Sequence, residues 1–211
     1  MKYLSVTTEG NTLTLSETAL VLQGLTIDKK PVKDHLEVIG HKYAFDYILD
    51  IVQSKEKLTE FTIKNMHSLV LMDRPEDKGV YRKIPVTILG SSHNPISPYL
   101  ISKKMEDLLI SLVEWYSKKH IIETIALFHL HFESIHPFID GNGRTGRLLI
   151  NLMLMQQGYL AINIKYTNRL KYYKCFEDFH KTNNPKLMIK LVYDLLKDEM
   201  KKYIGKLRIS F

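Results

Sequence analysis

The sequence predicts a mostly α-helical protein with a single short β segment, and three observations support that prediction. Apolar residues recur at spacings of three and four through most of the 211 residues, which is the period of a buried helix face. Only residues 80–89 combine β-branched side chains with strand-like alternation. Hydrophobic content of 45% and charged content of 25% are ordinary globular values, so we expect one domain spanning residues 1–211.

The helical periodicity can be followed along the chain. Thr59 and Thr167 are expected to cap the helices that follow them, and His67 is expected to be a hydrogen-bonded core histidine, not a ligand. The expected helices span residues 16–24, 31–54, 59–69, 97–119, 121–135, 147–158, 167–182 and 185–205.

Composition argues against several classes of protein. The single Cys175 excludes an intramolecular disulfide and fits a reducing compartment. The sequence has no apolar stretch typical of a signal peptide or a membrane span, so we expect a cytoplasmic protein without a membrane partner. The formal charge of +7 comes from lysines scattered over most helices, so nucleic acid is not expected as a partner.

Packing does not explain the stretch that begins at His136 and reads His-Pro-Phe-Ile-Asp-Gly-Asn-Gly-Arg-Thr-Gly-Arg. Gly141, Asn142 and Gly143 predict a turn in which both glycines adopt positive φ and successive N–H groups form an anion-binding nest. The nest is expected at a helix N-terminus, which also favours anions. Arg144 and Arg147 are three residues apart and are expected to point toward the same anion. Phosphate is the predicted ligand.

Two further side chains in this stretch suggest a reaction. An aspartate beside a phosphate site would repel the ligand without a hard cation between them, so Asp140 predicts Mg²⁺ shared with the phosphates. His136 has an intrinsic pKa near neutrality and could accept a proton from an attacking hydroxyl. The stretch therefore predicts transfer of a phosphorus-containing group.

The stretch 136–147 resembles the signature of the Fic family at every defining position. Tyr81-Arg82 and residues 86–95 resemble the family's flap hairpin, and residues 9–18 are similar to its N-terminal segment. The resemblance implies a Fic-type helical bundle with one β-hairpin flap at 80–95, which would align an extended target protein through main-chain hydrogen bonds. The flap residues it implies are Leu89, Gly90, Ser91 and Ser92.

The resemblance also implies an activity, the transfer of AMP from ATP to a Ser, Thr or Tyr hydroxyl of a target protein. His136 would be the base, and Asp140 would hold Mg²⁺ against the α- and β-phosphates. The nest and Asn142 would stabilise the α-phosphoryl oxygens, Arg144 the β-phosphate and Arg147 the γ-phosphate. Self-modification is a further implied outcome, and a homo-oligomer is left open.

The resemblance assigns further residues at two other places in the chain. Ser5 and Glu9 match an inhibitory motif whose glutamate pairs with the second arginine, here Arg147. Tyr172 matches an aromatic residue that borders the nucleotide, while His180 stands where the family has asparagine. Tyr172 and its neighbour could equally be core residues.

Five alternatives to AMP transfer use residues in or near this stretch. Gly143 argues against the related phosphotransferase toxins, which carry lysine there. Removal of AMP from a modified protein, or a catalytically silent nucleotide-binding module, would use the same residues. His129, Glu133 and His136 share a helix face and could form half of a carboxylate-bridged metal site, but no second such helix is found. A Gly-x-Gly-x-x-Gly pattern at 141–146 lacks the preceding strand of a dinucleotide fold.

Overall fold

The computed structural model describes residues 11–88, 91 and 93–209, with the side chains of 166, 208 and 209 left out. These residues form helices joined mostly by short connections, apart from the long connection over residues 71–97, with two 3₁₀ turns, η2 and η3. The helices are α1 (Leu15–Leu22), α2 (Val32–Ser54), α3 (Glu60–Val70), η2 (Pro98–Leu100), α4 (Ile101–Lys118), α5 (Ile121–Ile135), α6 (Asn142–Gln156), η3 (Tyr166–Asn168), α7 (Arg169–Thr182) and α8 (Lys186–Ile209).

Most predicted helices are confirmed, with two corrections to their starts. Thr59 caps α3 by accepting a hydrogen bond from the Thr62 amide, as predicted. The helix after the nest begins at Asn142, five residues earlier than expected, because the glycines there were interpreted as a turn. The N-cap of α7 is Asn168 and not Thr167.

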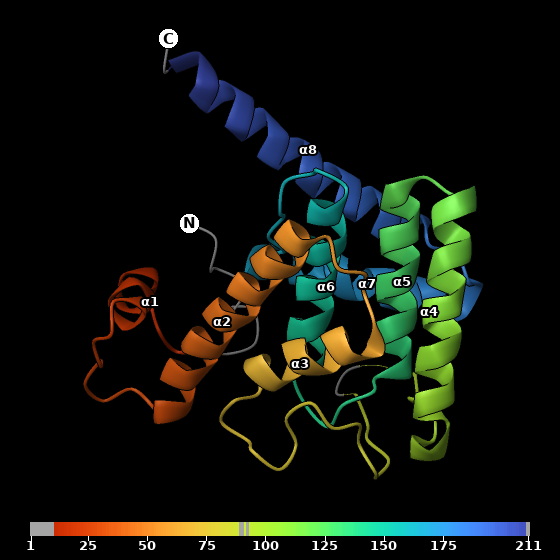
Figure 1. Ribbon diagram of the computed structural model, residues 1–211, viewed down its shortest axis with the longest axis horizontal. Helices are drawn as coiled ribbons and strands as arrows, with labels where there is room; N and C mark the ends of the chain where they lie inside the picture. Colours follow the sequence, from red (N-terminus) through yellow and green to blue (C-terminus); the bar gives the residue numbers. More distant parts are fainter. Residues whose placement is uncertain (1–10, 89–90, 92, 210–211) are drawn as a thin grey trace.

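Helices α5 and α6 form the centre of the fold. They pack against each other, α4 and α8 cover α5, and α2 and α3 cover α6 (Figure 1). Phe128 and Phe132 of α5 and Leu152 of α6 are each at most 1% exposed. Because burying a side chain of this size contributes about 1.5–3 kcal/mol, this core holds the junction between α5 and α6 in place. We call residues 136–147, which span that junction, the catalytic loop, after the role that the family resemblance implies.

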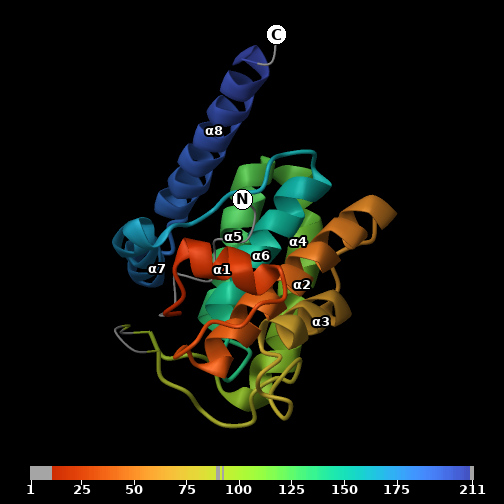
Figure 2. The same ribbon diagram turned by 90° about the vertical axis from the view of Figure 1, so that its left-hand side faces the viewer.

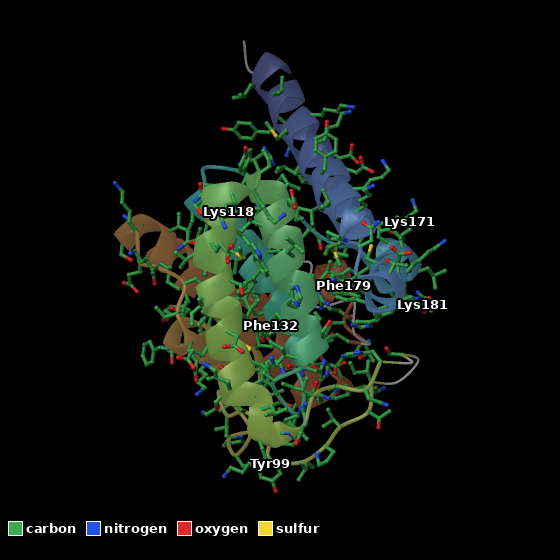
Figure 3. All side chains as sticks on the ribbon, turned by 90° about the vertical axis from the view of Figure 1, so that its right-hand side faces the viewer. Tyr99, Lys118, Phe132, Lys171, Phe179 and Lys181 are labelled. Carbon is green, nitrogen blue, oxygen red and sulfur yellow. The ribbon has the colours of Figure 1, made fainter. Side chains whose placement is uncertain are left out.

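The remaining helices lie around this centre. Helix α1 lies across α2, where a small separate cluster buries Leu13, Val21 and Val38 (Figure 2). Helix α7 packs on α8 through its inward side, which carries Phe179, whereas Lys171 and Lys181 lie on its outer side (Figure 3). The C-terminal half of α8 extends beyond the helical bundle (Figure 1). No helix in the described part of the chain is long and apolar enough to span a membrane.

The predicted β-hairpin is unconfirmed. Residues 80–88 form neither strand nor helix, although the sequence pattern favours a strand there. Ser91 is described, while Leu89, Gly90 and Ser92 lie outside the described residues. We call residues 80–95 the flap segment below. A strand requires a hydrogen-bonded partner strand, which a local pattern alone does not supply.

Candidate functional site

A pocket of ≈ 880 Å³ opens at the junction between α5 and α6. Its walls come from the catalytic loop, the last turn of α5, helix α7 and the flap segment. A pocket of this size can enclose a nucleotide. It brings together most of the residues predicted from the sequence, namely Ser91, His136, Asp140, Gly141, Asn142, Gly143, Arg147, Tyr172 and His180.

His136 lies at the C-terminal cap of α5 in a left-handed backbone conformation, with φ 50° and ψ 62°. A non-glycine residue in this region stores strain of about 1–3 kcal/mol, which the surrounding structure must offset. Its Nδ1 is buried, so Nε2 is the nitrogen available to the pocket. Burial, together with the nearby charge of Arg82, lowers the pKa of His136 to about 4. The imidazole is therefore neutral at pH 7 and can accept a proton.

Arg82 holds the backbone at His136 and at the residue that follows it. Its Nε donates to the His136 carbonyl at 2.8 Å, and its own amide donates to the Pro137 carbonyl at 2.9 Å. The same guanidinium donates to the carbonyls of Ile84 at 3.1 Å and Ile96 at 2.6 Å. Arg82 thus joins Ile84 of the flap segment, and Ile96 just after it, to the catalytic loop. Its partners are up to 55 residues away, so sequence patterns gave no sign of this role.

Gly141 begins α6 and faces the pocket. It has φ 73°, as predicted, whereas Gly143 lies inside the helix and does not have positive φ, so that half of the nest prediction is wrong. No side chain caps α6 within the described residues, and its first residues line the pocket. Because the first N–H groups of a helix lack intrahelical acceptors, they remain able to bind an anion there.

The side chain of Asn142 fastens the catalytic loop. Its Oδ1 accepts from the Phe138 amide and its Nδ2 donates to the Phe138 carbonyl, both at 2.9 Å. The predicted contact of this amide with a phosphate is therefore not supported, because both polar atoms are occupied and the residue is 2% exposed. Phe138 is fully buried and anchors the loop in the core, as expected.

Asp140 points its carboxylate into the pocket between two arginines. Oδ1 accepts from the Gly141 amide at 2.6 Å and lies 3.4 Å from Arg144, while Oδ2 lies 3.5 Å from Arg74. Burial opposes ionisation, but Arg144 and the Gly141 amide hold the pKa of Asp140 below its usual value. An ionised carboxylate that faces a nucleotide-sized pocket fits Mg²⁺, which is commonly held by one or two carboxylates together with substrate phosphates.

The two arginines of the motif do not point in the same direction. Arg147 lines the pocket. Arg144 is instead directed toward α2, where its Nη1 lies 3.2 Å from Oε1 of Glu37, and it does not line the pocket. The predicted contact of Arg144 with a phosphate therefore has no support, and its position indicates that it orients Asp140. The sequence could not reveal Glu37, which is 107 residues away.

His67 of α3 supports the loop from the opposite side. Its Nδ1 accepts from the Gly79 amide at 2.8 Å, and its Nε2 donates to the Asp140 carbonyl at 2.9 Å. The ring stacks on Phe138 at a centroid distance of 3.6 Å. Burial lowers the pKa of His67 to about 4, which preserves the neutral form that this pair of bonds requires. The prediction of a hydrogen-bonded core histidine is confirmed.

Tyr172 is both a core residue and a wall of the pocket. It is 5% exposed, and its hydroxyl lies 2.8 Å from Nε2 of His129. That contact argues against the alternative metal site, since it occupies a nitrogen of one of the three proposed ligands. No group of three or more His, Cys, Asp or Glu side chains among the described residues could hold a metal ion.

Gly146 is a structural requirement that we did not anticipate. A Cβ at this position would collide with Oε1 of Glu133 and lie 2.8 Å from Cε1 of His129. The absence of a side chain therefore allows α5 and α6 to approach closely beside the pocket. The closely spaced glycines were visible in the sequence, but the partners of this one lie on another helix.

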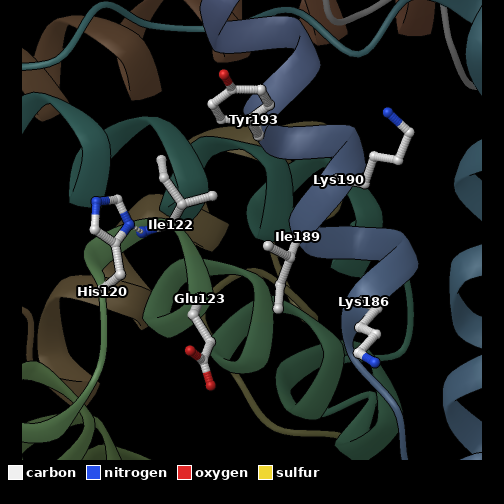
Figure 4. A pocket seen from close by; sticks show the side chains of 7 residues that line it. All are labelled: His120, Ile122, Glu123, Lys186, Ile189, Lys190 and Tyr193. Carbon is white, nitrogen blue, oxygen red and sulfur yellow. Dashed lines mark hydrogen bonds between the residues drawn. The ribbon is translucent and has the colours of Figure 1, made fainter.

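A second, shallower pocket of ≈ 390 Å³ lies between the start of α5 and α8 (Figure 4). Ile122 and Ile189 form its apolar floor, and the ammonium groups of Lys186 and Lys190 point away from them. Its carboxylate, Glu123, forms an ion pair with Lys119. Because no residue of the motif reaches it, we do not assign the predicted chemistry to this pocket. Ser5 and Glu9 lie outside the described residues.

The fold and site define a class of protein. It is a helical bundle in which a neutral histidine, a carboxylate, a helix N-terminus and an arginine surround one nucleotide-sized pocket. Residues 57–154 match the family described as the Fic/DOC family. The chain therefore contains a Fic/DOC family domain.

Relatives and solved structures agree with this assignment. The chain is 38% identical over 177 residues to the proteins named "Protein adenylyltransferase Fic" from Drosophila willistoni and Drosophila melanogaster, which covers 81% of this chain and 34% and 35% of theirs. It thus spans about a third of the length of these curated relatives. A Fic domain containing signaling protein from Bacteroides thetaiotaomicron superimposes with a TM-score of 0.83 at 28% identity, covering 92% of this chain and 81% of that one. A fragment of C. elegans Fic-1 gives 0.82 at 28% identity, with 99% and 63% covered.

Proposed function

We propose that this protein is an adenylyltransferase that transfers AMP from ATP to a hydroxyl group of a target protein. The observation that carries the proposal is the arrangement around one pocket of neutral His136, ionised Asp140 and the uncapped start of α6. The name of the Drosophila relatives supports the same activity. The role proposed for each residue follows from its position.

In the proposed reaction, Nε2 of His136 accepts the proton of the target hydroxyl as its oxygen bonds to the α-phosphorus of ATP. The bond from the α-phosphorus to the bridging oxygen breaks, and pyrophosphate leaves with the bonding electrons. A positioned base of this kind contributes typically ~10²–10⁴ in rate. The amides that begin α6 and the guanidinium of Arg147 bind phosphate oxygens, which keeps positive charge where negative charge develops.

Asp140 is proposed to hold Mg²⁺, which would neutralise the phosphate charge. Arg144 keeps the carboxylate oriented toward the pocket, and the Asn142 bonds to Phe138 keep the turn in shape. Tyr172 forms the wall on which the base or ribose of the nucleotide would rest. His136, Asp140 and α6 thus arrive preorganised, which lowers the cost of reaching the transition state.

Two finer proposals follow from the family resemblance. Glu9 would pair with Arg147 and hold the nucleotide in an unproductive pose, so Glu9→Gly should raise self-modification. The flap segment would bind the target protein in extended form. Removal of AMP from a modified protein, or nucleotide binding without transfer, are the competing functions for the same pocket.

Intact mass spectrometry after incubation with ATP and Mg²⁺ tests the activity. The Glu9→Gly variant should gain the mass of AMP, and the additional His136→Ala change should remove that gain. The additional change His120→Asn, at an exposed helix cap, serves as the matched control and should retain it. Nucleotide binding without any mass gain would instead favour the silent module.

A further inference from the structure

Three side chains from three separate elements meet beside the pocket. His93 belongs to the flap segment, Ser134 to the last turn of α5 and His180 to α7. The two imidazole rings stack with a centroid distance of 3.8 Å and an interplanar angle of 15°. Nε2 of His93 lies 3.0 Å from the Ser134 carbonyl oxygen, and Nε2 of His180 lies 2.8 Å from Ser134 Oγ. We call these three residues the histidine clasp.

The hydrogen bonds determine where the protons of the clasp lie. A carbonyl oxygen only accepts, so His93 must donate from Nε2. Ser134 Oγ donates its single proton to the Leu130 carbonyl at 2.8 Å, so it must accept a hydrogen bond from Nε2 of His180. Both rings therefore carry a proton on Nε2. Burial, and secondarily His93, lowers the pKa of His180 to about 4, so this ring is neutral at pH 7 and the stack carries no repelling pair of charges.

This arrangement limits what His180 can offer a nucleotide. Its only donor is bonded to Ser134, and one face of its ring is covered by His93. Nδ1 remains as a lone acceptor. His180, which stands where the family has asparagine, thus uses its donor and one ring face for contacts within the protein, even though it lines the pocket.

The clasp also lies close to the reacting groups. Ser134 is two residues before His136, and the amide of His93 donates to Oγ of Ser91, which lines the pocket. Arg82 donates to the carbonyl of Ile84 within the flap segment and to that of Ile96 just after it. His93 adds an attachment between these two points, where its ring stacks on His180 of α7.

We propose that the histidine clasp ties the flap segment to the nucleotide pocket, so that His180 acts as a positioning residue for the flap segment. A shift of α7 on nucleotide binding then also moves Ser91 and His93. This movement couples the nucleotide site to the surface that would receive the target. The functional purpose of this coupling rests on the proposed function. Its physical content, a link between α7 and the flap segment, can be measured without catalysis.

Hydrogen–deuterium exchange of the full chain, with and without AMP-PNP, tests the clasp. We expect His93→Ala and His180→Asn each to speed exchange of the peptide carrying the Ser91 and His93 amides by about fivefold or more, because each removes the stack and one hydrogen bond. His180→Phe keeps an aromatic face for His93 and should restore part of the protection. Lys181→Ala, at the exposed neighbouring position of α7, is the matched control and should leave exchange unchanged.

The double variant separates coupling from independent effects. If the clasp is one unit, the exchange rate of His93→Ala combined with His180→Asn should resemble that of either single variant. Multiplicative effects of the two changes on the exchange rate would overturn the proposal. Unchanged exchange in His180→Asn together with weakened AMP-PNP binding would also overturn it, and would return His180 to the role of a nucleotide ligand. Failure of the wild-type protein to bind AMP-PNP would count against the proposed function, while the exchange comparison without ligand would still decide the clasp.

Discussion

The catalytic loop and the flap segment face the same pocket but are held very differently. Each part of the loop is fixed by a specific bond: Asn142 closes it on itself, His67 holds the Asp140 carbonyl, and Arg82 holds the carbonyl of His136. Residues 80–88 form no regular structure, and Arg82 bonds to the carbonyls of Ile84 and Ile96 around them. The difference suggests that groups doing chemistry need one fixed geometry, whereas a surface that receives varied partners gains from having few internal constraints.

Removing Arg82 should affect both regions at once and gives the largest expected change. Arg82→Met leaves the carbonyls of Ile84, Ile96 and His136 without their donor, so the free energy of unfolding should fall by about 4 kcal/mol. Arg74→Met is the matched control, because that side chain is 37% exposed and should cost at most about 1 kcal/mol. Equal losses in urea unfolding would show that Arg82 is not the common anchor.

Replacing His67 should weaken the loop in a pH-dependent way. The folded-state pKa of His67, about 4, lies below the ordinary value of 6.5, so the neutral ring contributes stability that is present above pH 6.5 and is lost as pH falls toward 4. The stability difference between wild type and His67→Asn should therefore shrink by about 2 kcal/mol between pH 7.5 and pH 5. His120→Asn, at an exposed cap, provides the comparison. A pH-independent difference would refute the assigned neutral bonding.

Replacing Gly141 tests whether the N-terminus of α6 requires a residue without a side chain at its cap. Gly141→Ala combines an unfavourable φ of 73° with a Cβ only 3.3 Å from His67, and we expect about 2 kcal/mol of destabilisation together with weakened AMP-PNP binding. Gly158 has φ 78° but nothing within 4 Å of an added Cβ, so Gly158→Ala should cost about 1 kcal/mol and leave binding intact. Calorimetric titration of both variants measures the contrast; equal binding would remove Gly141 from the anion site.

The smallest effect is expected in the flap segment itself. Ile84 is 59% exposed, so Ile84→Ala should change the free energy of unfolding by less than about 0.5 kcal/mol. The same chemical change at buried Ile150 of α6 should cost about 2–5 kcal/mol. If Ile84→Ala destabilised the protein as strongly as Ile150→Ala, the flap segment would be part of the core, and the contrast between the two regions would fail.

Sequence patterns were sufficient for most of the helices and for grouping most of the motif residues around one pocket. Helical periodicity and the Thr59 cap are local properties, and the motif residues are contiguous, so most of them reach one pocket. What could not be predicted depends on distant partners. Glu37 turns Arg144 away from the pocket, and Gly146 is required because Glu133 and His129 approach from α5.

The turn assigned within the motif and the unconfirmed strand at residues 80–89 have a common cause. Gly141, Asn142 and Gly143 were assigned by residue type to an irregular turn, but the helix begins at Asn142, and the asparagine amide closes the loop on Phe138. The strand expected at residues 80–89 followed local β propensity, which is weak without a partner strand. In both places the contacts made by the folded chain outweighed the local preference.

The position of the label transferred from ATP tests the central claim most directly. The claim is that His136 directs a hydroxyl at the α-phosphorus of a nucleotide held at the start of α6. With the Glu9→Gly variant, label at the α-phosphate should become bound to protein and label at the γ-phosphate should not, and His136→Ala should abolish incorporation. Transfer of the γ-label, or α-label that persists without His136, would contradict the account.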